Sequence, residues 1–196
     1  MEVLYADPQI LVIQKPVGLD SEQQVPQALR ETLGGEVFPL HRLDKNVGGL
    51  MVYARTKEAA GALSASVQRG EMEKEYVALV HGVPPEGGVF EDYLFKDSLK
   101  NKVFIVKSKR KGVKFARLEY TRLTSGDPSL VRIRLQTGRS HQIRVQFASR
   151  GFPLVGDRKY GARDGETAPK LFSCRLAFPY RGKTAVFEAL PPWAEK

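Results

Sequence analysis

The stretch Leu130-Val131-Arg132-Ile133-Arg134-Leu135-Gln136 alternates apolar side chains with cationic or polar ones at every second residue. Because successive side chains of a β-strand point to opposite faces, this pattern predicts a strand with one core face and one cationic face. Further strands are predicted over residues 10–15, 50–55, 76–81, 90–95, 103–107, 115–123, 171–178 and 184–189. Helices are expected over 26–33, from an N-cap at Thr56 to 69, and from a cap at Ser140 to 150. Many strands without regular helix alternation predict one continuous α+β domain, 1–196, on a mixed or antiparallel sheet.

The composition narrows the class of protein. The chain of 196 residues has 42% hydrophobic residues, which is ordinary for a globular domain and excludes disorder. Its N-terminus has neither the basic nor the apolar region of a secretory signal, and no run of eighteen apolar residues occurs, so a cytoplasmic protein is expected. One cysteine, Cys174, and three scattered histidines give no metal-ligand spacing, so neither a metal nor a disulfide is expected.

The chain carries a formal charge of +9, and a regular anionic partner, most commonly nucleic acid, would offset the mutual repulsion of these cations. Residues 96–117 hold nine of them against the single acid Asp97. Such a stretch can be the charged edge strand that protects a sheet from aggregation. We interpret it instead as a phosphate-contacting surface, centred on a basic triplet formed by Lys109, Arg110 and Lys111.

Two segments could carry chemistry. His41-Arg42-Leu43-Asp44-Lys45-Asn46-Val47-Gly48-Gly49-Leu50 is a polar, glycine-containing loop directly before an apolar strand, where reactive groups are often held. It can equally be a turn in which the carboxylate accepts backbone N–H groups. Leu135-Gln136-Thr137-Gly138-Arg139-Ser140-His141-Gln142-Ile143-Arg144 predicts a strand, a turn and a helix N-terminus that favours anions, although its arginines can instead form structural salt bridges.

Taken together, these segments resemble the RluA-like pseudouridine synthases, which isomerise uridine in RNA. The resemblance runs from about residue 3 to 190 and rests on five motifs in the family's order. They are His41-Arg42-Leu43-Asp44 with Gly49-Leu50, Gly138 to Arg144, Lys15-Pro16-x-Gly18, Lys74-x-Tyr76, and Gly156-Asp157-x-x-Tyr160-Gly161. The resemblance implies the pseudouridine synthase fold, with a largely antiparallel mixed sheet, flanking helices and an RNA-binding cleft. It also implies a stand-alone catalytic domain without the N-terminal RNA-binding domain of many members.

The resemblance assigns roles to three residues. Asp44 matches the family's essential carboxylate, which acts as a nucleophile or as a base toward the ribose. Arg144 matches the arginine that pairs with it and holds it ionised, as an adjacent cation does for any carboxylate. Tyr76 matches the tyrosine that lies against the target base and is a candidate to remove the C5 proton, while its ring can also simply pack in the sheet. Because the reaction is an isomerisation, no cofactor is expected.

The remaining assignments concern RNA. Arg42 matches the residue that fills the gap left by the extruded uridine, and substrate or RNA binding is also expected of Lys15, Arg139, His141 and the basic triplet. The partner is ribosomal or transfer RNA, the processing of either is the expected biological role, and a monomer is expected. Val47-Gly48 replaces the family's common Thr-Ser, and Gln146 replaces a frequent His. These departures favour an alternative, an RNA-binding protein of the same fold with weak or lost catalysis.

Overall fold

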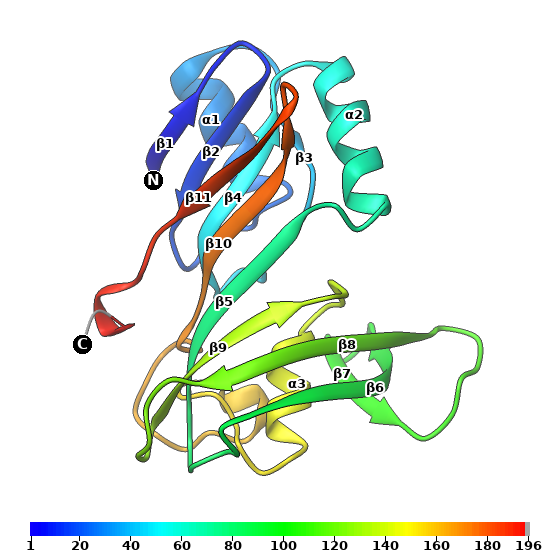
Figure 1. The fold of residues 1–196 in the computed structure, drawn as a ribbon, viewed down its shortest axis with the longest axis vertical. Coiled ribbons are helices and arrows are strands. Elements are labelled where there is room, and N and C mark those ends of the chain that lie inside the picture. The colour runs from blue at the N-terminus through cyan, green and yellow to red at the C-terminus, as the bar shows by residue number, and fades with distance from the viewer. Residues whose placement is uncertain (195–196) are drawn as a thin grey trace. The chain divides into compact units, whose positions relative to one another are not determined.

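The computed structural model describes residues 1–194, and the chain divides into two compact units. Unit 1 comprises Met1–Lys74 together with the chain from Phe172 onward, and unit 2 comprises Glu75–Leu171. The boundary runs through two long strands, β5 (Glu73–Val80) and β10 (Leu171–Tyr180). Figure 1 labels the elements of both units along the chain. Each unit has a β-sheet and its own apolar core, and each is described by itself below.

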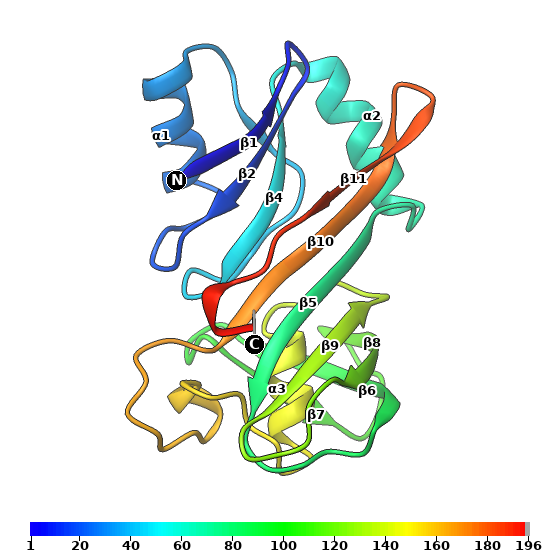
Figure 2. The same ribbon diagram turned by 60° about the vertical axis from the view of Figure 1, so that its left-hand side comes forward.

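Unit 1 is built mainly from antiparallel strand pairs. Its other elements are β1 (Glu2–Ala6), β2 (Ile10–Lys15), α1 (Gln24–Leu33), β3 (Phe38–Pro39), β4 (Gly48–Ala54), α2 (Lys57–Gln68), β11 (Lys183–Glu188) and a 3-10 turn at Pro192–Ala194. The strand order is β1-β2-β4-β10, with β11 on β10 and β3 on β4, and only the β4–β10 pair is parallel. Figure 2 shows β10 and β11 as a long hairpin.

The core of unit 1 follows from the apolar runs of β2 and β4. Every residue of β4 is buried, as is typical of a strand covered on both faces. These strands pack with α2, which begins where the Thr56 hydroxyl accepts the Ala59 N–H at 3.1 Å. The core contains Ile10, Val12, Leu50, Val52, Leu63, Met72, Leu176 and Phe178. The strand that follows the Asp44 loop is therefore anchored along its whole length.

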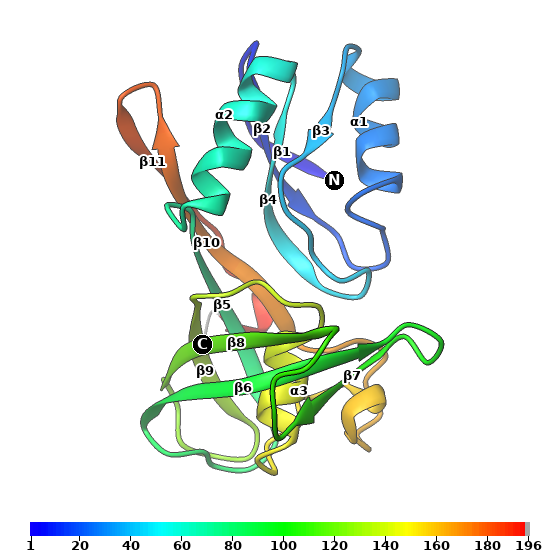
Figure 3. The ribbon, with the colours of Figure 1, turned by 90° about the vertical axis from the view of Figure 1, so that its right-hand side faces the viewer.

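Unit 2 is an antiparallel sheet that packs on a short helix. Its elements, after β5, are β6 (Gly87–Asp97), β7 (Lys102–Val106), β8 (Val113–Arg122), β9 (Ser129–Leu135), α3 (Gln142–Ala148) and a 3-10 turn at Arg158–Tyr160. The strand order is β5-β9-β8-β6-β7. Figure 3 shows α3 beside the β6–β8 strands, and contacts of α3 with β6 and β7 place it against the sheet. Between the sheet and the helix, three aromatic rings pack against one another: Phe90, Tyr120 and Phe147.

The alternation in residues 130–136 is confirmed, since Val131 and Ile133 are buried and the arginine that follows each of them is exposed. The helix expected from a Ser140 cap to residue 150 is present, but the predicted cap is wrong and the helix is shorter. The helix begins at Gln142 and ends at Ala148, and its N-cap residue is His141 in a left-handed conformation. The side chain of Gln142 accepts the Arg139 N–H at 3.0 Å and so organises the turn in place of a serine hydroxyl. Strands β1 and β3 were not predicted from the sequence.

Candidate functional site

Asp44 lies in a tight turn directly before β4 in unit 1. The Val47 N–H donates to the Asp44 carbonyl at 2.9 Å, which closes the turn, and Val47 itself is buried. The turn is fastened to the segment after β2, because the Gly18 N–H donates to the Lys45 carbonyl at 2.8 Å. The half-buried Asp44 side chain is thus carried by a backbone that is held on both sides.

Ser21 holds the residue before Asp44 from both directions. Its hydroxyl donates to the Leu43 carbonyl at 2.9 Å and accepts the Leu43 N–H at 3.1 Å. The buried Tyr53 hydroxyl donates to the Ser21 carbonyl at 2.8 Å, which ties this contact to β4. The sequence pattern assigned no role to Ser21. The fold shows that it supports the Asp44 turn.

Lys15, at the end of β2, is buried beneath this turn. The side chain is 1% exposed, and its ammonium donates to the carbonyls of Pro16 and Leu19, both at 2.9 Å, and of Lys45 at 3.3 Å. Burial lowers the pKa of Lys15 to about 8, while the negative charges of Asp20 and Asp44 act in the opposite direction. This position favours support of the loop over direct contact with RNA.

Arg42 and His41 differ in exposure although they are neighbours. Arg42 is on the surface, where it pairs with Glu22 at 3.0 Å. His41 is turned inward, and its Nε2 accepts the Val52 N–H of β4 at 3.2 Å. Burial, with a smaller effect of the Lys74 charge, holds the pKa of His41 well below its usual value, so the ring is neutral. His41 therefore anchors the motif, while Arg42 remains accessible.

In unit 2, Arg144 projects from α3 into a buried ion pair with Asp157. Its Nε donates to one carboxylate oxygen at 2.7 Å and its Nη2 to the other at 2.8 Å. The two side chains are 9% and 1% exposed. This bidentate geometry fixes the plane of the guanidinium. The Gly156-Asp157 motif was noted in the sequence, but its role in orienting Arg144 was not predicted.

Tyr160 adds a second support to Arg144. The guanidinium carbon lies 5.2 Å from the Tyr160 ring centroid, within the range of a cation–π contact. The Tyr160 hydroxyl accepts the Val103 N–H of β7 at 2.9 Å and is joined to His141 Nδ1 at the same distance. His141 is thus held against Tyr160 at the start of α3, which places two motifs of the sequence in one network.

The turn before α3 holds Arg139 at the surface. Its side-chain Nε donates to the Phe115 carbonyl of β8 at 2.9 Å. Gln142 fixes the turn, because its side-chain oxygen accepts from Thr137 at 2.8 Å and its nitrogen donates to the Arg117 carbonyl at 3.1 Å. Tyr76 lies elsewhere in unit 2, on β5, and is buried.

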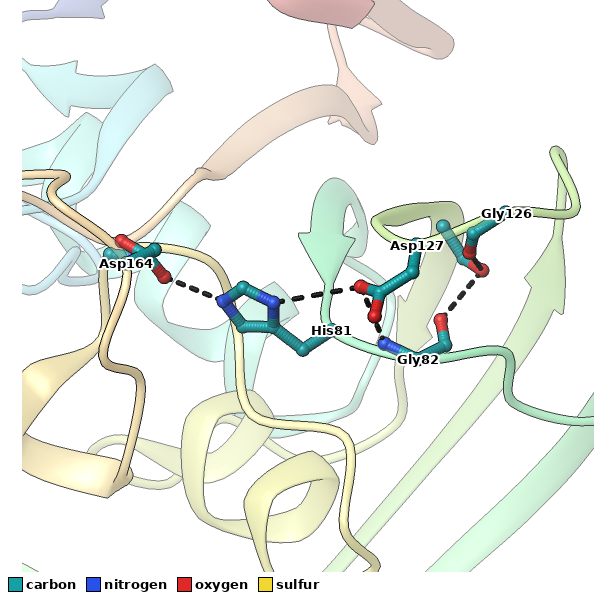
Figure 4. Close-up of polar contacts among 7 residues, drawn as sticks. His81, Gly82, Gly126, Asp127 and Asp164 are labelled. Carbon is teal, nitrogen blue, oxygen red and sulfur yellow. Dashed lines mark hydrogen bonds and ion pairs between the residues drawn. The ribbon is translucent and has the colours of Figure 1, made fainter.

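The segment that carries Asp157 and Tyr160 is clamped by Asp164, whose contact with the His81 ring is drawn in Figure 4. The Asp164 carboxylate accepts the Gly156 N–H at 2.9 Å and lies 2.6 Å from His81 Nε2. The Gly156 hydrogen bond, followed by that of His81, lowers the pKa of Asp164 to about 2. On the other side of the ring, His81 Nδ1 lies 3.6 Å from Asp127. The sequence pattern gave no signal for this clamp.

The basic triplet lies in the loop between β7 and β8, and all three side chains are exposed. Among the residues of the triplet, Arg110 covers the Phe95 ring, with 5.6 Å between the guanidinium carbon and the ring centroid. Within residues 1–194, no cluster of His, Cys, Asp and Glu has the geometry to hold a metal ion. No helix in the same range is long and apolar enough to cross a membrane.

Within each unit the fold gathers several of the expected residues. Unit 1 holds Asp44 in a turn that the Lys15 ammonium binds, with Arg42 two positions earlier in the chain, and unit 2 holds Arg144 and His141 around Tyr160. The fold class is the mixed, largely antiparallel α+β class that the sequence predicted. A solved structure, Human RNA Pseudouridylate Synthase Domain Containing 1, shares this fold with a TM-score of 0.85 and 24% identity, over 97% of this chain and 83% of that chain.

Sequence comparisons extend the likeness beyond the fold. tRNA pseudouridine synthase C of Haemophilus ducreyi is 33% identical over 181 residues, covering 82% of this chain and 74% of that protein. Ribosomal large subunit pseudouridine synthase D of Pseudomonas aeruginosa is 36% identical over 180 residues, covering 83% of this chain and 54% of that protein. Residues 9–149 match the RNA pseudouridylate synthase family. The chain belongs to this family, which confirms the resemblance of its motifs.

Proposed function

We propose that this chain converts uridine to pseudouridine in RNA, with Asp44 as the essential carboxylate. The reaction breaks the bond from the ribose C1′ to uracil N1 and forms the bond from C1′ to C5. N1 gains a proton and C5 loses one, so the product is an isomer of the substrate. The observation that carries the proposal is the family match over residues 9–149, which includes Asp44 in a turn fastened by Lys15 and Ser21.

The proposed roles of the other residues follow from charge and support. By the family resemblance Arg144 is the arginine that pairs with the essential carboxylate, and the bidentate contact with Asp157 supports such a role because it fixes the plane of the guanidinium. Tyr76 lies against the base and takes the C5 proton. The two units then serve as one catalytic domain. Trapping a covalent intermediate between Asp44 and the sugar would decide whether Asp44 acts as nucleophile or as base.

RNA is held by cations of different exposure. Arg42 fills the gap left by the extruded uridine, and its exposed pairing with Glu22 is weak enough to be exchanged for RNA. Arg139, His141 and the basic triplet contact the strand, and Lys15 contributes by shaping the Asp44 turn. The substrate is a transfer or ribosomal RNA, as the names of the two relatives suggest, and the enzyme acts in the cytoplasm as a monomer.

The decisive experiment compares the parent protein with Asp44→Ala on a uridine-labelled transcript of tRNA or rRNA. Because the conversion leaves the mass unchanged, digested nucleosides are separated by retention. We expect the variant to form no pseudouridine while its affinity for RNA stays within about twofold of the parent. Glu71→Gln, which changes an exposed acid of the same unit, is the control. Pseudouridine formed by Asp44→Ala at the parent rate would overturn the proposal.

The alternative, an RNA-binding protein of this fold with weak catalysis, rests on Val47-Gly48 and Gln146. The structure accommodates these departures. A Cβ at Gly48 would lie 3.3 Å from the Lys15 carbonyl, so a glycine suits this tight position. Gln146 is buried in α3 and donates to Asp92 at 2.7 Å, so it has a packing role of its own. The same transcript assay decides between the two, since this alternative requires RNA binding by a parent protein that forms no pseudouridine.

A further inference from the structure

One face of the unit 2 sheet carries four aromatic rings. In the antiparallel pairings Tyr93 is opposite Phe115 and Phe95 is opposite Phe104, and directly opposed residues share a face. The other face buries Leu94, Val103 and Ala116 against Val145 of α3. We call the set Tyr93, Phe95, Phe104 and Phe115 the aromatic face. Phe104 is 38% exposed and Phe115 is 43% exposed, so these two rings are in contact with solvent and are not part of the packed core.

Cations lie over these rings. Lys102 Nζ is 5.7 Å from the Phe104 centroid and Arg110 is 5.6 Å from the Phe95 centroid. Tyr93 and Phe115 contact each other edge to face, with centroids 5.9 Å apart. Phe95 and Phe104 each have a cation above the ring, and the neighbouring Tyr93–Phe115 pair is exposed at Phe115. The aromatic face therefore presents flat apolar surface next to positive charge. This combination fits a planar ligand that carries negative charge.

The charge around the aromatic face is nearly all positive. The chain from residue 102 to 117 contains seven basic residues and no acid. Among the acids on this face, Glu91 and Glu119 are both paired with Arg117. Asp97, opposite Lys102 at the end of β6, accepts the Lys100 N–H at 3.0 Å. An acidic peptide could satisfy the charge, but it would supply few planar groups for four rings. A nucleic acid strand supplies both a phosphate on every nucleotide and a base to stack.

We propose that the aromatic face binds an unpaired RNA segment, with bases stacked on Phe104 and Phe115 and phosphates held by Lys102 and the basic triplet. Stacking requires bases that are splayed from a helix, because a duplex hides their planes and presents only its backbone. The segment belongs to the substrate RNA of the proposed function, on which the biological meaning of this surface rests. The enzyme would thus select uridines whose flanking nucleotides are single-stranded.

The test measures binding of the full chain to a twelve-nucleotide oligouridine and to a twelve-base-pair RNA duplex. Phe115→Ala and Phe104→Ala should each weaken binding to oligouridine by about 5- to 150-fold, the loss expected for one stacked base, and change duplex binding less than about twofold. Phe115→Tyr should retain the parent affinity, whereas Phe115→Leu should lose it despite its apolar area. Val186→Ala, which changes an exposed residue of unit 1, is the control.

Three outcomes would overturn the proposal. Oligouridine affinity that is unchanged in both alanine variants excludes stacking, and equal losses for single strand and duplex indicate a general phosphate effect. A parent protein that sediments as a dimer, and Phe104→Ala as a monomer, assigns the face to self-association. Pseudouridine formation by the parent protein is scored separately. If it is absent while the stacking losses occur, the proposed function fails and the single-strand site stands; the reverse result removes only the site.

Discussion

Replacing Asp157 by alanine removes the acidic half of the buried ion pair on α3. Arg144 would keep its charge in a site that is 9% exposed while losing two hydrogen bonds of 2.7 and 2.8 Å. Breaking one partner of a buried pair costs about 3–5 kcal/mol, because the remaining charge has to be accommodated away from water. We expect Asp157→Ala to lower the free energy of unfolding by this amount and to reduce pseudouridine formation.

The chain contains a second arginine–carboxylate pair with the same bonding but much greater exposure. Arg69 and Glu71 form the same two-bond contact, at 2.7 and 2.8 Å, on side chains that are 59% and 38% exposed. Solvent screens such an exposed pair and makes its contribution to stability small, so Glu71→Ala should barely change the free energy of unfolding. Urea unfolding followed by circular dichroism, with both variants at one protein concentration, measures the difference directly.

A double variant separates stability from chemistry. Arg144→Met with Asp157→Leu replaces both charges by apolar side chains, which is often neutral for stability when the volume is conserved. We expect it to recover most of the unfolding free energy lost in Asp157→Ala but none of the pseudouridine formation. If Asp157→Ala costs no more than Glu71→Ala, burial of the pair is not what orders this part of unit 2. If the double variant is active, Arg144 is not part of the chemistry.

Three further changes probe the rest of the chain. Changing the basic triplet to glutamine should reduce the slope of log affinity against log salt by about 2, for three lost contacts to a single strand, and should do so for every RNA tested. Gly49→Ala should lower the free energy of unfolding in urea by about 3 kcal/mol or more, because the Gly49 φ is +120° and a Cβ would lie 2.4 Å from the β10 backbone. Gly61→Ala in α2, where a Cβ meets open space, should not lower it. In the folded chain the pKa of Lys15 is lowered from 10.5 to about 8, so between these pH values the unfolded chain binds more protons than the folded one. The free energy of unfolding of the parent, relative to that of Lys15→Met, should therefore rise by about 2–3 kcal/mol from pH 7 to pH 10. A flat difference between these two proteins would show that the ammonium is not desolvated.

Local pattern predicted the strands well where burial alone decides them. β2 has the bounds that its apolar run indicated, and β9 alternates as expected because its two faces have different surroundings. The start of α3 was mispredicted because the turn is organised by Gln142 and because His141 contacts Tyr160, nineteen positions away. Such contacts are set by tertiary packing, so capping preferences alone give no access to them.

The same limit applies to the candidate site. The motifs located Asp44 and Arg144, but a motif does not state what a side chain touches. Lys15, part of a family motif, was expected to bind substrate or RNA. Its side chain is instead buried, which is rare for lysine, and three backbone carbonyls bind it inside the fold. Asp157 was visible only as one letter of a glycine-aspartate pattern. Its value lies in a pair that forms because the loop after α3 turns back on the helix.

Some cations of this chain are buried and others are exposed, and the two groups should respond differently to salt. Arg144 and Lys15 are shielded from mobile ions, so salt should leave their contacts with Asp157 and the Asp44 turn nearly intact. The basic triplet is exposed, so salt should compete with the phosphate contacts that we propose for it. Raising the salt concentration should therefore raise the RNA concentration needed for half-maximal rate far more than it lowers the rate at saturating RNA. If salt lowers the rate at saturating RNA by the same factor as it raises the RNA concentration for half-maximal rate, the exposed cations also order the reacting groups. The assignment of exposed cations to binding and buried cations to chemistry would then be wrong.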